Sequence, residues 1–176
     1  MVARVNTVAF RGIDTLEIDV QVHIANTMPA VNIVGLPAKA VDESKDRVRS
    51  ALASLGLAFP PQRITVNLAP ADVIKEGSHY DLPIALGILA AMGVLSEEDL
   101  SGFCALGELA LDGRLTAVAG VLPAAIGASA RGRGIICPAA SGPEAAWAGR
   151  VEVLAPNDLM ALINHFKGIQ ILTPPS

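Results

Sequence analysis

Four residues whose side chains could do chemistry stand within one stretch, DVIKEGSHYD at residues 72–81: Lys75, Ser78, His79 and Asp81. A serine close to a histidine and a lysine suggests a nucleophile activated by a neighbouring base. The stretch also leads into a predicted helix, whose first N–H groups could stabilise an anion or oxyanion. We prefer a simpler interpretation, a polar loop whose Ser78 and Asp81 cap the helix, because adjacency in sequence is a poor guide to catalytic geometry.

The sequence lacks the standard nucleotide and metal signatures. The dipeptide Gly-Lys of a phosphate-binding loop does not occur, and the pair Gly132 and Gly134 lacks the third glycine of a dinucleotide fingerprint. The residues that prefer metals are scattered without ligand spacing; they are His23, His79, His165, Cys104 and Cys137. We therefore predict no cofactor and no metal in this chain.

The first half of the chain predicts the elements that position the 72–81 stretch. Residues 14–24 alternate strictly between apolar and polar side chains, which is typical of a strand with one solvated face. Residues 1–11 and 29–34 are predicted as neighbouring strands, so that three successive strands suggest an antiparallel meander. Residues 38–55 have a helical apolar stripe that ends at Gly56, and residues 63–68 form the next predicted strand.

Residues 81–93 are predicted as a helix that is apolar on nearly every side and therefore buried, with Asp81 as its cap. Further along, Asp112-Gly113 between apolar runs indicates a hairpin. Helices are predicted at 121–130, 142–148 and 157–166, the last of them capped by Asn157 or Asp158, and strands at 134–137 and 151–154. This irregular mixture favours an α+β fold, with the helix at 82–92 against the apolar face of one mainly antiparallel sheet.

Length and composition suggest one globular domain. The chain has 176 residues, of which 52% are hydrophobic, and a net charge of −4, which offers no general electrostatic attraction for nucleic acid. The longest uncharged apolar runs, 82–95 and 117–128, are shorter than the roughly 18 residues that suggest a membrane span. No signal peptide is evident. Two widely spaced cysteines fit buried thiols, and we expect a cytoplasmic protein.

Three blocks of sequence together resemble a known family. They are VGLPAKAVDESKDRVRS at residues 34–50, NLAPADVIKEGSHYDLPIALGIL at 67–89 and LGELALDGRLTAVAGVLPAA at 106–125. They are similar to the N-terminal domain of the magnesium-chelatase-like AAA+ ATPases of the ComM and YifB type. The resemblance covers residues 1–168 and implies a fold like the Lon proteolytic domain and domain 2 of ribosomal protein S5. Residues 169–176 would then be a linker toward an AAA+ domain that this sequence does not contain.

The resemblance also implies that the site has lost its catalytic residues. Lon-type proteases carry their nucleophile in a Lys-Asp-Gly-Pro-Ser-Ala-Gly loop, and alignment on Lys75 places His79 at the serine position. Their catalytic lysine aligns with Leu122. A histidine cannot be acylated as that serine is, and a leucine accepts no proton.

The resemblance implies a non-catalytic accessory domain of a hexameric branch-migration helicase that acts in natural transformation. Its partners would be its own AAA+ domain, which would bind ATP and Mg²⁺, neighbouring protomers, and DNA. The loop of Lys75, Ser78, His79 and Asp81 would remain as a contact surface, with Lys75 toward a DNA phosphate or a protomer. The alternative is a serine hydrolase with a rearranged Ser78/His79 site. A metal-handling subunit is a third hypothesis, suggested only by the chelatase-like family name.

Overall fold

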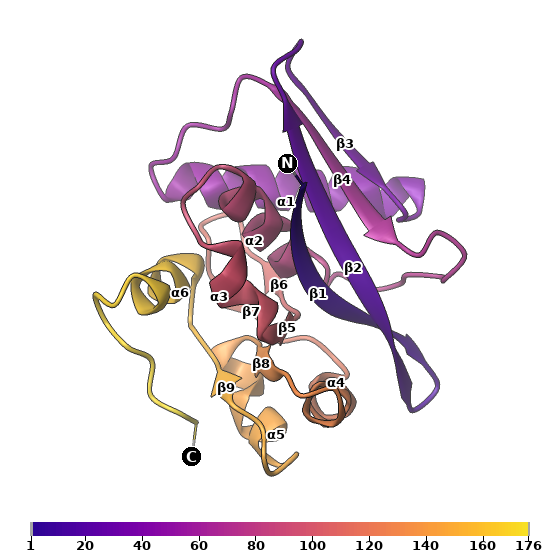
Figure 1. The fold of residues 1–176 in the computed structure, drawn as a ribbon, viewed down its shortest axis with the longest axis vertical. Coiled ribbons are helices and arrows are strands. Elements are labelled where there is room, and N and C mark those ends of the chain that lie inside the picture. Colours follow the sequence, from indigo (N-terminus) through magenta and orange to yellow (C-terminus); the bar gives the residue numbers. More distant parts are fainter. Residues whose placement is uncertain (1, 176) are drawn as a thin grey trace.

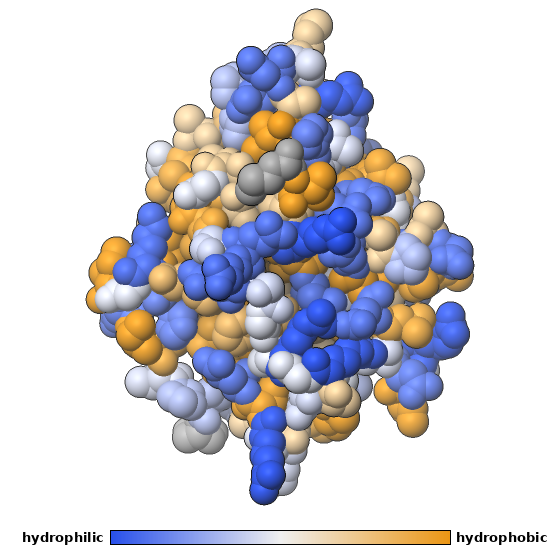
Figure 2. Space-filling view, in the orientation of Figure 1, coloured by the Kyte–Doolittle hydropathy of each residue, from blue (hydrophilic) through white to orange (hydrophobic). Residues whose placement is uncertain are grey.

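A long antiparallel hairpin forms the middle of the fold in the computed structural model, which describes residues 2–175 (Figure 1). Strand β1 (Val2–Arg11) pairs with β2 (Asp14–Ala25) along its whole length, from Val2 opposite His23 to Arg11 opposite Asp14. The predicted alternation in β2 is confirmed, since Ile18, Val20 and Val22 are fully buried. Figure 2 shows hydrophilic side chains gathered over the middle of the opposite face, where Figure 1 places β1 and β2.

The predicted meander is wrong, because the third strand does not pair with the second. The main sheet has the order β3-β4-β2-β1-β5-β8-β9. Strand β3 (Ala30–Val34) lies parallel to β4 (Arg63–Ala69), and β4 lies antiparallel to β2. The long helix between β3 and β4 returns the chain to the end of the sheet where β3 began, and this crossover makes the two strands parallel.

The second half of the chain extends the sheet through short parallel strands. Strand β5 (Phe103–Ala105) pairs with β1, β8 (Gly134–Ile136) pairs with β5, and β9 (Val153–Leu154) pairs with β8. Within the main sheet, as far as residues 2–175 form it, only the pairings β1–β2 and β2–β4 are antiparallel. The molecule is therefore an α/β fold with a mixed sheet, and the expectation of a mainly antiparallel sheet is corrected to that extent.

Two helices cover one face of the main sheet, the first beside β3 and the second over the hairpin. Helix α1 (Ala38–Ser54) ends before Gly56, whose φ of 76° is the left-handed conformation expected at a helix stop. Helix α2 (Asp81–Ala91) is buried from Asp81 to Ala90 and packs on β1 and β2, as predicted. The approach is close at Gly87, where a Cβ atom would come within 2.6 Å of Val22 Cγ2.

Helix α4 (Val121–Ala130) lies on the face of the sheet opposite to α2, near the C-terminal end of β1. Val5 and Ala9 of β1 belong to the core around α2, whereas Val8 belongs to a second core with Val121. The remaining elements close this half of the molecule: α3 (Glu97–Ser101), the hairpin of β6 (Glu108–Leu109) with β7 (Leu115–Thr116), the short 3-10 turn η1 (Ala139–Ser141), α5 (Gly142–Ala146) and α6 (Leu159–Phe166).

Helix α6 begins at Leu159, two residues later than predicted, and of the two predicted caps it uses Asp158, whose carboxylate accepts a hydrogen bond from the Ala161 N–H at 2.8 Å. Residues 169–175, within the predicted linker, form no helix or strand, and residue 176 lies outside the described residues. This segment folds back on α6, where the Leu172 N–H donates to His165 Nδ1 at 3.0 Å. Residues 2–175 contain no helix of the length and apolarity that a membrane crossing requires.

Candidate functional site

A cleft of ≈ 420 Å³ lies between α1 and the loop that leads into α2. The turn after β3 contributes Leu36 and Pro37 to its walls, and α1 contributes one polar side. The third wall is residues 75–78 together with Tyr80 and Asp81, so the cleft includes most of the stretch singled out from the sequence. The structure thus brings the predicted loop into a hollow, with α1 as its opposite wall.

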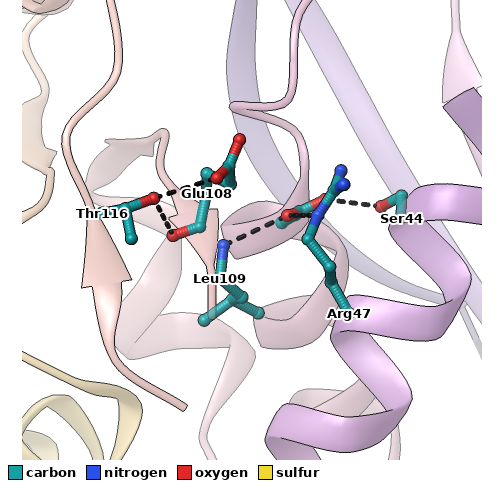
Figure 3. Close-up of polar contacts among 6 residues, drawn as sticks. Ser44, Arg47, Glu108, Leu109 and Thr116 are labelled. Carbon is teal, nitrogen blue, oxygen red and sulfur yellow. Dashed lines mark hydrogen bonds and ion pairs between the residues drawn. The ribbon is translucent and has the colours of Figure 1, made fainter. Parts of the chain in front are cut away.

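Asp81 stands at the start of α2 but does not cap it, which corrects the capping prediction. Its Oδ1 accepts hydrogen bonds from Ser44 Oγ at 2.7 Å and Arg47 Nη2 at 3.1 Å. Its Oδ2 accepts from Arg47 Nε at 2.6 Å and from the Leu109 N–H at 3.1 Å. In Figure 3, dashed lines run from Ser44 and Arg47 of α1 and from the Leu109 N–H of the β6–β7 hairpin to one unlabelled carboxylate, which is that of Asp81.

The carboxylate of Asp81 is therefore a junction between α1, α2 and the hairpin. Four donors occupy the roughly four acceptor positions that a carboxylate has. Burial raises the pKa of Asp81 above the ordinary carboxyl value, while the hydrogen bonds from Arg47, Ser44 and the Leu109 N–H act to lower it. The same pairing raises the pKa of Arg47. The Asp81 side chain therefore links three elements of the fold and has no free oxygen lone pair with which to accept a proton or bind a substrate.

The sequence analysis missed the partners of Asp81, although one of them left a signal. Ser44 falls on the apolar stripe of α1 between Val41 and Val48, at helical spacing from both. It is buried, with 3% of its surface exposed. A hydroxyl on the buried face of a helix needs a hydrogen-bonding partner, and Arg47 lies one turn further along. The Leu109 N–H had no such signal.

Lys75 is held by its own loop. Its Nζ donates to the Pro70 carbonyl oxygen at 2.6 Å, and only 2% of the residue is exposed. Burial lowers the pKa of Lys75, which the charge of Asp72 partly opposes. For the expected contact of Lys75, a DNA phosphate or a group of a protomer would have to enter the cleft that this residue lines.

His79 is also engaged, but toward the sheet. Its Nε2 lies 2.7 Å from the carbonyl oxygen of Val8, which can only accept, so Nε2 carries the proton. The ring lies 4.0 Å from the Tyr80 ring and 5.2 Å from the Phe10 ring, measured between centroids. Burial lowers the pKa of His79, so the neutral imidazole is favoured. This histidine is a packed core residue.

The remaining two predicted positions do not complete a catalytic pair. Ser78 is half-buried and lines the cleft, and within residues 2–175 no hydrogen bond joins its hydroxyl to His79 or Lys75. Leu122 is the second residue of α4, and its N–H donates to Glu144 Oε2 at 2.7 Å. Phe10 lies beside His79 and also beside Gly120, two residues before Leu122, where an added Cβ would lie 2.5 Å from its ring.

The cysteines and metal-binding side chains form no further centre in the part of the chain that the structure describes. Cys104 and Cys137 are free and buried, and burial raises the pKa of each thiol to about 12. No group of three histidine, cysteine or carboxylate side chains among the described residues is placed to hold a metal ion.

Comparison with known proteins identifies the family. Residues 20–141 match the family described as subunit ChlI of Mg-chelatase. The chain is 39% identical over 173 residues to the uncharacterized protein YifB of Salmonella typhimurium, covering 98% of this chain and 34% of that protein. It is 41% identical over 160 residues to the competence protein ComM of Haemophilus influenzae, covering 91% and 31%.

YifB of Escherichia coli is 40% identical over 171 residues, covering 97% of this chain and 34% of that protein. The chain therefore spans about a third of the length of the curated relatives it matches. The matched parts of this chain include the residues that line the α1–α2 cleft and the loop at residues 75–81. The chain belongs to the ChlI family of Mg-chelatase-like proteins, alongside YifB and ComM.

Proposed function

We propose that this chain is a non-catalytic, Lon-protease-like accessory domain of a ComM/YifB-type AAA+ ATPase. In this proposal residues 1–168 form the domain, with the fold of domain 2 of ribosomal protein S5, and help to assemble protomers into a ring and to guide DNA. ATP and Mg²⁺ would act in the AAA+ part, and the whole protein would be a cytoplasmic, hexameric branch-migration helicase. Membership in the ChlI family and the greater length of the relatives support this assignment.

The observation that carries the non-catalytic role is the engagement of the loop's reactive groups. Lys75 Nζ is bound to Pro70, His79 Nε2 to Val8, and the Asp81 carboxylate to four donors. A general base must reach the proton that it removes, and each of these groups is committed elsewhere. Ser78 is left without a base.

A fluorophosphonate probe tests this part of the proposal against the alternative, a serine hydrolase that uses Ser78 and His79. We expect no stoichiometric labelling of the chain and no turnover of an unfolded casein substrate. Ser78→Ala serves as the matched control, because it removes only the hydroxyl. Labelling that is present in the wild type and lost in Ser78→Ala would establish the hydrolase instead.

The assembly role is tested in the longer protein that contains the AAA+ part. Sedimentation velocity in the presence of ATP and Mg²⁺ would compare that protein with a version lacking residues 1–168. We expect the truncated form to assemble more weakly into rings, because it loses the proposed contacts between protomers. Equal assembly of both forms would contradict the role.

A further inference from the structure

The cleft between α1 and the loop before α2 contains more hydrogen-bond donors than acceptors, because the Asp81 carboxylate can accept no further hydrogen bond. The four acceptor positions of Asp81 are filled. Arg47 has five N–H groups and gives two to Asp81, so three remain. Arg47 lines the cleft, and its side chain is 23% exposed. An occupant of the cleft would therefore be recognised by the acceptors that it brings.

Tyr80 supplies an independent observation that points to a ligand. The residue is 1% exposed and lines the cleft, yet its hydroxyl has no hydrogen-bond partner among the described residues. Buried hydroxyl groups are nearly always paired, so an unpaired one requires an explanation. Lys75, in the same wall, uses one of three ammonium donors on Pro70. An oxyanion at this wall would give both side chains an acceptor.

The remaining walls restrict the charge and the body of the ligand. Leu36, Pro37 and Ala40 form an apolar side. Two exposed carboxylates of the cleft, Glu43 and Glu76, outnumber its one exposed cation, Lys39, and would repel a doubly charged group more strongly than a singly charged one. The volume of ≈ 420 Å³ falls within the range of small-molecule sites.

We propose that the α1–α2 cleft binds a singly charged carboxylate on a short apolar body, with Arg47, Lys75 and Tyr80 as the donors. A free aliphatic acid and the C-terminal end of a polypeptide share this chemistry. The proposal does not depend on the accessory role, because a ring-assembly defect and a binding defect are measured separately.

Titration of the full chain with four probes tests the ligand class, with amide NMR shifts of Ser78 and Asp81 as the readout. Hexanoate represents a free acid, and N-acetyl-alanyl-leucine represents a chain end; the tighter of the two identifies the source. Hexanamide keeps the apolar body without the charge, and inorganic phosphate carries the charge without the body. We expect saturable shifts with the carboxylates and at least about ten-fold weaker binding of the other two, as for loss of a charge-assisted hydrogen bond. Absence of saturation, or equal binding of hexanamide or phosphate, would overturn the proposal.

Tyr80→Phe tests the hydroxyl against a matched control. Thr7 is the other described residue with a buried, unpartnered side-chain oxygen, and it is absent from the walls of this cleft. We expect Tyr80→Phe to raise the Kd for the tighter carboxylate about five-fold, the value of one hydrogen bond, and Thr7→Val to leave it unchanged. The same Kd in both variants would mean that the hydroxyl does not meet the ligand.

A second pair of variants keeps the test decisive if Tyr80→Phe does not fold. Lys75→Met removes the ammonium and leaves the exposed Pro70 carbonyl to water. Lys45→Met is its control, because Lys45 Nζ lies on α1 but donates to Val31 outside the cleft. We expect about ten-fold weaker carboxylate binding in Lys75→Met only. Equal binding by these two variants would overturn the proposal.

Discussion

At the scale of single residues, the loop before α2 shows how chemically versatile side chains serve structural roles. Asp81 binds two residues of α1 and one backbone N–H of the hairpin, while His79 binds the backbone of β1. Asp81 and His79 are themselves buried. Removing one partner therefore costs more than the bond itself, because the other is left buried and unpaired.

Asp81→Asn is expected to destabilise the protein by about 3 kcal/mol, as for other broken buried ion pairs. The amide would turn an N–H₂ group toward donors of Arg47 and the Leu109 N–H. Urea denaturation measures the free energy of unfolding. Asp112→Asn is the control, because Asp112 and Arg114 form an exposed pair, and we expect its midpoint to be unchanged. Equal midpoints for the two variants would contradict the junction role of Asp81.

His79 predicts how stability depends on pH. Burial places the folded-state pKa of His79 below its unfolded value of about 6.5, so the unfolded chain binds the extra proton first. Stability from this group is complete above that value and is lost as the pH falls toward the folded pKa. The stability lost between pH 8 and pH 5 should therefore be smaller in His79→Gln than in the wild type. Parallel pH profiles in urea denaturation would refute this assignment.

At the scale of elements, the contact between α2 and the hairpin depends on a missing side chain. Gly87 lets the helix approach Val22 and Val5 of the sheet. Glycine in a helix interior is less favourable than alanine by up to about 1 kcal/mol. Its presence here follows from the close packing, because helix propensity alone would favour alanine.

Gly87→Ala is expected to lower stability by about 1 kcal/mol net, since overpacking costs about 1–3 kcal/mol and exceeds the gain in propensity. Its Cβ would lie 2.6 Å from Val22 Cγ2. Adding Val22→Ala should recover part of the loss in urea denaturation. Gly102→Ala is the control, because no heavy atom lies within 4 Å of a Cβ there. A stabilised Gly87→Ala protein would show that the helix can shift freely.

At the scale of the whole molecule, the balance of charge limits what the chain can do alone. It has 13 basic and 17 acidic residues, and several bases are already paired, such as Arg133 with Glu17. Lys75, the cation expected to meet a phosphate, is buried. If the chain guides DNA as we propose, that guidance would thus depend on the proposed ring and its AAA+ parts.

The isolated chain is therefore expected to bind duplex DNA no more tightly than about 10⁻⁴ M at physiological salt, the weak end of non-specific binding. Fluorescence anisotropy with a labelled duplex measures this affinity. Lys75→Ala should leave the result unchanged. Micromolar binding with a steep salt dependence that Lys75→Ala flattens by about one unit would instead identify Lys75 as a phosphate contact.

The sequence by itself determined the features that depend on near neighbours. The alternation in β2, the buried character of α2 and the cap at Asp158 follow from residue type and spacing within a few positions. The family was also evident from three separated blocks of sequence, and the comparisons confirm it. The local patterns depend on neighbouring residues, and the family is identified by comparing sequences. Neither kind of signal requires knowledge of which distant segments are in contact.

Only the tertiary structure decided which distant segments meet. Strand β3 pairs with β4 across the whole of α1, and Asp81 finds Ser44, Arg47 and Leu109 at separations of 37, 34 and 28 residues. A capping aspartate and a buried junction look the same in sequence, because both place a carboxylate at the start of a helix. The packing of α1 against α2 directed this carboxylate away from the helix N–H groups, since a buried charge is stable only beside donors that compensate its lost hydration.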